Sequence, residues 1–184
     1  QKLYFINSEV EGFKKSYEPT LVTYFEQGNL FPGFEIYNSY KTNSLKRIKW
    51  AIEFLTEYPK LDSNRTYAPD RTELNWASSV DELDETWKNL ITFEFLNETL
   101  AKLDTNETLD DISDSNLTSA KQESQKVLLK RYSRWQKNLE EFEAGDVQEL
   151  YLTALTQMFD PHTTFMNLKE KEKFDQQMNN EFVG

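Results

Sequence analysis

Three side chains near the end of the chain have the types and spacing that nucleophilic catalysis uses. Asp160, His162 and Thr163 lie in the segment Asp160-Pro161-His162-Thr163-Thr164-Phe165, where His162 could act as general base for a threonine hydroxyl. His162 is the single histidine, so any Ser-His-Asp triad would need it, and the absence of cysteine excludes a thiolate nucleophile. No Gly-rich loop that could bind an oxyanion stands beside the segment. A small acidic enzyme that uses these three residues is one hypothesis.

The same segment has a structural interpretation that needs no catalysis. The Asp160 carboxylate can accept hydrogen bonds from backbone N–H groups two or three residues further on, and Pro161 fixes its own φ. The Thr163 hydroxyl can satisfy a further backbone group. We interpret Asp160, Pro161, His162 and Thr163 as a rigid structural corner, and we assign no catalytic residue in the chain.

Carboxylates offer a second kind of chemistry, but their pattern is weak. Glu140, Glu141 and Glu143 could form an acid–base or metal site, yet their place at the polar end of an expected helix favours a solvated face. The acidic run 104–114 lacks the glycine and the D-x-[DN]-x-[DN]-G pattern of a calcium loop. One histidine and no cysteine exclude a cluster of those ligands. The sequence therefore indicates no metal site and no cofactor.

Composition indicates long helices around an aromatic core. Aromatic residues make up 14% of the 184 residues, while 5 Gly and 5 Pro are too few for a turn-rich β-sandwich. A net charge of −11 repels phosphate backbones, so nucleic acid is not an expected partner. No apolar run approaches the roughly 20 residues that a membrane span needs.

Capping signals and apolar periodicity divide the chain into elements. We predict an all-α, irregular bundle of about six helices with one long acidic loop at Asp104–Ser119, which we expect to be mobile. The expected helices cover about 8–27 (kinked or broken at Pro19), 32–59, 80–103, 119–145, 146–159 and 167–178. Their expected N-terminal caps are Ser8, Ser79, Ser119, Asp146 and Asn167, and the expected terminators include Gly28 and Gly145. The predicted buried face of 80–103 is Val80, Leu83, Trp87, Leu90, Phe93, Leu96, Leu100 and Leu103.

One segment resembles a known family. The stretch 151–166, YLTALTQMFDPHTTFM, resembles the signature just ahead of the PDZ domain in carboxyl-terminal processing proteases. Weaker similarity to the long, periplasmic, tail-specific branch of that family lies at 75–76, 82–89, 131–132, 145–147, 172–174 and 181–184.

This resemblance implies a division of the chain and a set of partners. Residues 1–159 would be the helical N-terminal domain, and 160–184 would be the corner, a short helix and a connector toward a PDZ domain and a protease core. In the family, a Ser-Lys dyad performs peptide cleavage and the PDZ domain captures apolar C-terminal tails of protein substrates. Both would lie after Gly184. The expected partners are therefore that PDZ domain and core, with a helical-repeat adaptor or a second protomer as further possibilities.

Two further hypotheses of function stand beside that of a small acidic enzyme. The first is the non-catalytic helical region of a periplasmic tail-specific protease, which frames substrate access and positions the PDZ domain and core. The second is a free-standing helical scaffold or interaction domain with no protease attached. Continuation of the reading frame into a PDZ-like sequence would separate them.

Overall fold

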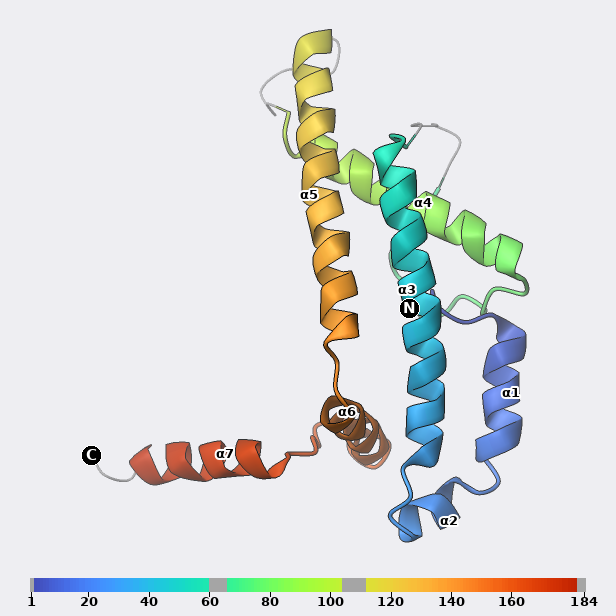
Figure 1. The fold of residues 1–184 in the computed structure, drawn as a ribbon, viewed down its shortest axis with the longest axis vertical. Helices are drawn as coiled ribbons and strands as arrows, with labels where there is room; N and C mark the ends of the chain where they lie inside the picture. Colours follow the sequence, from blue (N-terminus) through green and yellow to red (C-terminus); the bar gives the residue numbers. More distant parts are fainter. Residues whose placement is uncertain (1, 60–65, 104–111, 182–184) are drawn as a thin grey trace. The chain divides into compact units, whose positions relative to one another are not determined.

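The fold is all-α. The computed structural model describes residues 2–59, 66–103 and 112–181, and within them it contains seven helices and no strand (Figure 1). The helices are α1 (Asn7–Tyr17), α2 (Leu21–Glu26), α3 (Phe31–Thr56), α4 (Val80–Leu100), α5 (Asp114–Glu140), α6 (Ala144–Gln157) and α7 (Leu168–Glu181). The predicted fold class is confirmed. The first expected helix is broken in two near Pro19, as its ring and missing N–H predict, and α2 ends before Gly28 at φ 64°.

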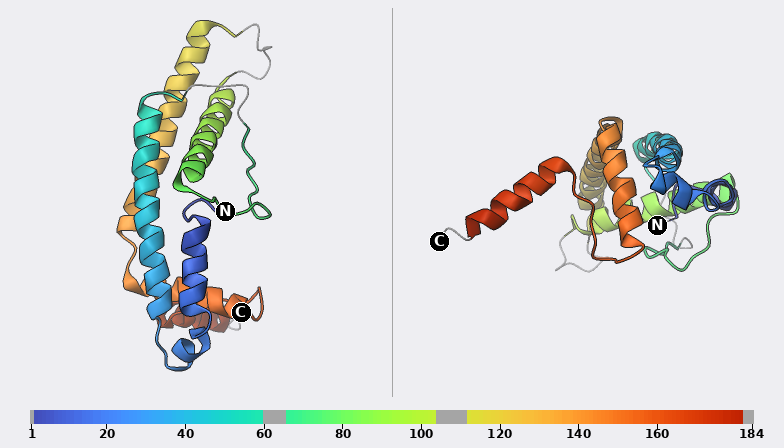
Figure 2. Two further views of the ribbon diagram at one scale, coloured as in Figure 1. Left: turned by 90° about the vertical axis from the view of Figure 1, so that its right-hand side faces the viewer. Right: turned by 90° about the horizontal axis from the view of Figure 1, so that it is seen from below.

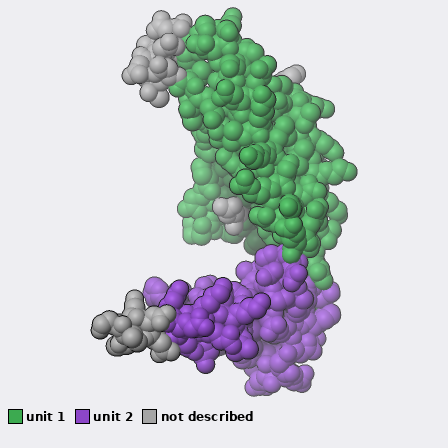
Figure 3. All heavy atoms as spheres, turned by 60° about the vertical axis from the view of Figure 1, so that its left-hand side comes forward, with its two compact units in different colours: residues 1–19, 38–141 green, residues 20–37, 142–184 purple. Residues whose placement is uncertain are grey.

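The chain divides into two compact units, coloured separately in Figure 3. Unit 1 comprises Gln1–Pro19 and Asn38–Glu141, and unit 2 comprises Thr20–Tyr37 and Phe142–Gly184. Because α3 begins in one and continues in the other, the units are interleaved in sequence. The boundary expected between 159 and 160 divides the chain by function and stays a prediction.

Unit 1 is built around α4. This helix crosses α3 in Figure 1, lies beside it in the left view of Figure 2, and packs against α5. The N-terminal segment enters the same core: the Trp87 indole, fully buried on α4, donates a hydrogen bond of 2.6 Å to the carbonyl of Leu3. The Tyr4 ring lies edge-on to Trp87 and Trp135, at centroid distances of 5.9 and 6.0 Å. Such edge-to-face contacts stabilise the core beyond the area they bury.

The buried face of α4 differs from the predicted stripe. Leu83, Trp87, Ile91, Phe95 and Thr99 are buried at a step of four residues. Three residues of the predicted face are instead exposed: Val80 (56%), Leu96 (37%) and Leu100 (43%). The helix carries apolar residues on most of its sides, so spacing alone does not single out one face. Thr99 tolerates burial because its hydroxyl donates to the Phe95 carbonyl at 2.7 Å.

The helix α5 begins earlier than predicted, which shortens the expected acidic loop. Ser113 is its N-cap, and the Ser113 hydroxyl accepts from the Asn116 backbone N–H at 3.2 Å. Residues 114–119 are therefore helical, and the cap expected at Ser119 is wrong. Asp104–Asp111 lie outside the described residues. The Gln125 side chain of α5 donates to the Leu55 carbonyl at 2.8 Å and so satisfies an end of α3.

Two other helix starts are also shifted relative to the sequence pattern. Ile6, not Ser8, is the N-cap of α1, and the Glu9 carboxylate accepts from the Ile6 backbone N–H at 2.9 Å. Gly145 does not end α5; it lies in the first turn of α6, where Asp146 accepts from the Glu143 N–H at 2.8 Å. In each case a carboxylate three residues into the helix reaches back to the cap residue.

Unit 2 packs α6 against the first turns of α3. Gly33 on α3 lies directly under the Tyr151 ring of α6, and the rings of Tyr37 and Phe142 stack at 5.1 Å. The cap predicted for the last helix is confirmed: Asn167 accepts from the Glu170 N–H at 3.0 Å, and Glu170 accepts from the Asn167 N–H at 3.2 Å.

Candidate functional site

The segment predicted as a corner forms a turn between α6 and α7. The Asp160 carboxylate accepts a hydrogen bond of 2.9 Å from the His162 backbone N–H, and the Asp160 carbonyl accepts one of 3.0 Å from the Thr163 N–H. These are the local bonds that an aspartate followed by proline favours. The side chains of Asp160, Pro161, His162 and Thr163 are all exposed. The rigidity of this corner stays a prediction.

The turn does not assemble the catalytic arrangement that its residue types allow. Within the described part of the chain, neither the His162 ring nor the Thr163 hydroxyl makes a hydrogen bond to another side chain. A general base must lie within hydrogen-bond reach of the proton that it removes, and a third group must orient it. The Asp160 carboxylate binds the backbone of His162 instead of its ring. The hydrogen bonds of this segment are the local backbone bonds of a turn, and its role as a structural corner stays a prediction.

A second link ties the end of this turn to the preceding helix. The Asn167 amide donates to the Glu149 carboxylate of α6 at 2.8 Å, while the Asn167 oxygen caps α7. One residue thus fixes the start of α7 with respect to α6, inside unit 2. The sequence predicted the cap but not the contact with Glu149, because the two residues are 18 positions apart.

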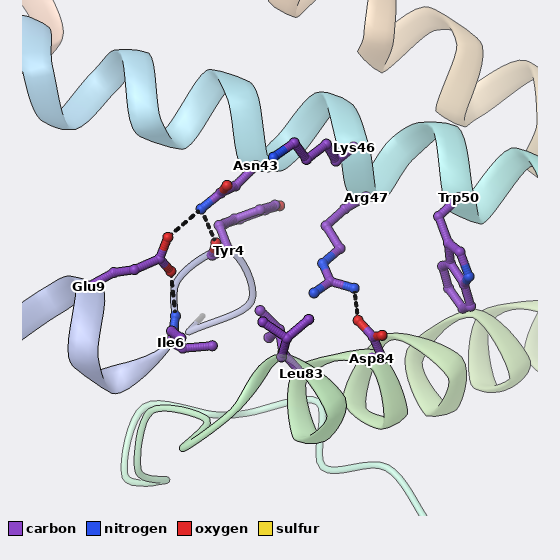
Figure 4. Close-up of a pocket in the computed structure, with 10 residues that line it drawn as sticks. Tyr4, Ile6, Glu9, Asn43, Lys46, Arg47, Trp50, Leu83 and Asp84 are labelled. Atoms are coloured by element: carbon purple, nitrogen blue, oxygen red, sulfur yellow. Dashed lines mark hydrogen bonds and ion pairs between the residues drawn. The ribbon is translucent and has the colours of Figure 1, made fainter.

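A hollow in unit 1 lies between the N-terminal segment, α3 and the start of α4 (Figure 4). Its volume is about 400 Å³. The lining combines apolar and charged side chains: Tyr4, Ile6, Glu9, Asn43, Lys46, Arg47, Trp50, Val80, Leu83 and Asp84. Figure 4 shows Arg47 and Trp50 pointing from α3 toward α4, with Leu83 opposite them.

The polar groups of this hollow are largely bonded to one another. Arg47 forms an ion pair with Asp84, and its side chain is only 15% exposed. The Asn43 amide donates to the Tyr4 carbonyl at 2.9 Å and to the Glu9 carboxylate at 3.2 Å. Both carboxylates of the lining therefore have partners among the neighbouring side chains. No Ser, Thr or Cys lines the hollow, so it offers no hydroxyl or thiol nucleophile. Its bonds hold the N-terminal segment onto α3 and α4.

A partly exposed cluster of charged side chains around the buried Tyr132 joins α4 to α5. The Tyr132 hydroxyl donates to the Glu94 carboxylate at 2.8 Å, and Arg131 pairs with Glu98 at 3.3 Å. Burial, and then the Glu94 charge, raise the pKa of Tyr132 well above its ordinary value of 10.0. Burial, with the neighbouring Tyr40 and Glu94, raises the pKa of Tyr4 as well. Both phenols stay protonated at neutral pH, where both rings pack in the core and the Tyr132 hydroxyl donates its hydrogen bond to Glu94.

Sequence reasoning missed Arg47 as a structural residue. The pattern placed Lys46, Arg47 and Lys49 off the apolar stripe of α3, and so on a solvated face. Lys46 and Lys49 are exposed as expected, but Arg47 turns toward α4 and binds Asp84. A partner 37 residues away leaves no local signal, although Arg47 directly precedes the fully buried Ile48.

Across 2–59, 66–103 and 112–181, no three His, Cys, Asp or Glu side chains gather as a metal site would require. No helix in the same ranges has the length and apolar character to cross a bilayer.

The fold places the chain among all-α domains built on an aromatic core, and comparison with known proteins identifies the family. The model of the tail specific protease N-terminal domain matches residues 1–169, so the chain belongs to that family. A curated relative, the tail-specific protease of Haemophilus influenzae (strain ATCC 51907 / DSM 11121 / KW20 / Rd), is 22% identical over 180 residues. The match covers 98% of this chain and 24% of the relative. The chain thus spans about a quarter of that bacterial protease.

Proposed function

We propose that this chain is the non-catalytic N-terminal region of a periplasmic, carboxyl-terminal processing serine endopeptidase. Its role is to frame substrate access and to position the PDZ domain and the protease core. The observation that carries this proposal is the family match over residues 1–169, joined to a relative that is about four times as long.

Burial excludes two of the described serines, Ser44 and Ser124, as nucleophiles. A Ser-Lys protease needs an accessible serine within reach of a lysine that burial keeps neutral. Ser44 and Ser124 are fully buried, and the Ser124 hydroxyl donates to the Ala120 carbonyl at 2.7 Å. Neither can reach a peptide bond. In this proposal the catalytic serine and lysine lie in other parts of the protease.

The local geometry of unit 2 supports a positioning role. The Asp160 turn and the Asn167–Glu149 bond set the path of the chain from α6 into α7. The start of α7 is therefore held against α6 within unit 2. This arrangement suits a domain that orients the rest of its own polypeptide.

The proposal names partners by their chemistry. The first are the PDZ domain and protease core of the same polypeptide. Protein substrates with apolar C-termini would be captured by that PDZ domain through strand addition and carboxylate binding. A helical-repeat adaptor or a second protomer are further candidate partners for the helical surface.

The test compares the complete gene product with a variant that lacks residues 1–181. We expect the complete protein to cleave a folded substrate that carries an apolar, disordered C-terminal tail, and the variant, whose PDZ domain and core are no longer positioned, to cleave it more slowly. Equal rates of cleavage of this substrate by the two proteins would contradict the proposal. A natural protein with an intact mass near 21.8 kDa would instead support the free-standing scaffold.

A further inference from the structure

Unit 2 exposes a group of large apolar side chains along α7 and the turn before it. We call this group the α7 strip: Met158, Phe159, Met166, Leu168, Phe174 and Met178. Phe159 is 91% exposed, and Met158 and Leu168 are each 74% exposed. Single exposed apolar residues are ordinary, but a run of them over 21 residues indicates a contact surface.

The helix α7 has no core of its own to support it. None of its side chains from Leu168 to Met178 is buried, whereas α4 buries six residues. An isolated helix of 14 residues is marginal in water, because few backbone bonds offset the cost of nucleation. Figures 1 and 2 show α7 joined to α6 through the 158–167 segment, without another helix of unit 2 covering its length. Its stability therefore depends on a partner.

The comparisons indicate where that partner comes from. The N-terminal domain family matches up to residue 169, so nearly all of α7 lies past the end of that domain. The match to the bacterial protease continues through this region, and 24% of that protease is accounted for by this chain. The helix thus belongs to the passage from the helical domain into the remaining polypeptide.

We propose that the α7 strip is the docking surface for the region of the same protease that follows the N-terminal domain. This inference rests on the proposed function and adds the residues that make the contact. Asn167 is a positioning residue in this scheme: its bonds to Glu149 and to the Glu170 N–H hold the start of α7 against α6. Phe159 and Phe174 supply the largest apolar area, and so they anchor the contact.

The experiment measures amide hydrogen exchange of α7 in the complete protein. The test variant carries Phe159→Ser and Phe174→Ser, and the matched control carries Phe25→Ser on α2, where the ring is 54% exposed. We expect exchange in 168–181 to become about 100-fold faster in the test variant, because the variant lacks two rings that the docked region would bury. The control should leave α7 unchanged. Exchange within α4 should stay the same in both, which shows that unit 1 is folded.

The outcomes separate this inference from the function on which it rests. Fast α7 exchange in the unaltered complete protein, or no change in the test variant, would overturn the docking surface while leaving the protease assignment intact. Protection of α7 that rises with protein concentration would also overturn it, because the occupant would then be a second copy. Failure of the proposed function would give a different result, because the complete protein would then not cleave tailed substrates at all.

Discussion

The contact between Gly33 and Tyr151 permits a sharp test of how α6 packs on α3 in unit 2. A Cβ atom added at Gly33 would lie 2.4 Å from Tyr151 Cγ, and 2.7 and 2.8 Å from its two Cδ atoms. These atoms form the part of the ring next to Cβ. Movement of the outer part of the ring therefore cannot relieve the overlap. Gly33→Ala must therefore displace Tyr151 or the whole of α6.

The expected change in the free energy of unfolding follows from two opposing effects of Gly33→Ala. Overpacking of this kind destabilises by about 1–3 kcal/mol. Replacing glycine by alanine in a helix contributes at most about 1 kcal/mol in the other direction. We expect Gly33→Ala to lower the free energy of unfolding by about 1–2 kcal/mol.

Gly12 in α1 provides the matched control, since an added Cβ there meets nothing within 4 Å. Gly12→Ala should raise the free energy of unfolding by about 0.5–1 kcal/mol. In a Tyr151→Ala background, Gly33→Ala should lose its penalty and become neutral or stabilising. The measurement is a urea titration followed by helical circular dichroism, completed as a double-mutant cycle. A stabilising Gly33→Ala in the unaltered chain, or an unchanged penalty without the Tyr151 ring, would refute the packing.

Three further predictions concern the core, alkaline pH and the corner. Trp87→Phe should destabilise by about 2–4 kcal/mol in a urea titration, because it leaves a cavity and an unpaired Leu3 carbonyl. The pKa of Tyr132 is raised in the folded state, so its contribution to stability should be fully present below pH 10.0 and lost as pH rises above that value. Tyr132→Phe should flatten this alkaline decline in thermal melts. Asp160→Ala should cost about 1 kcal/mol by urea titration, the scale of a lost capping bond.

Each of these three predictions has an outcome that would contradict it. A Trp87→Phe variant within 0.5 kcal/mol of the parent would show that the buried indole bond contributes little. Alkaline melting that is identical with and without the Tyr132 hydroxyl would place the titrating group elsewhere. An Asp160→Ala variant with unchanged stability and unchanged exchange at His162 and Thr163 would show that the corner is not held by this carboxylate.

Local signals in the sequence predicted the fold where both partners of a contact are close in the chain. The Asn167–Glu170 capping box, the break near Pro19 and the stop at Gly28 all depend on residues within one turn. The predicted cap of α5 was wrong because serine is tolerated inside a helix, so the capping pattern of Ser119 does not exclude an earlier start at Ser113. Choosing between them requires knowledge of which residues α5 buries against α4.

Contacts between distant segments were beyond sequence reasoning for the same physical reason. Arg47 and Asp84 are 37 residues apart, and Trp87 binds the Leu3 carbonyl 84 residues away. In α4 the apolar residues surround most of the helix, so only the positions of α3, α5 and the N-terminal segment select the face that is buried. The corner at Asp160 was predictable because its hydrogen bonds span two and three residues.

The central claim is that this region of the protease does not itself cleave peptides. The most direct measurement incubates the 184-residue chain with a peptide that ends in apolar residues, alongside the complete protein, and follows both by mass spectrometry. We expect cleavage by the complete protein and none by the 184-residue chain, because in the proposed function the catalytic serine and lysine lie in other parts of the protease. Reproducible cleavage by the chain, abolished by His162→Ala, would contradict the account and assign catalysis to the Asp160 turn.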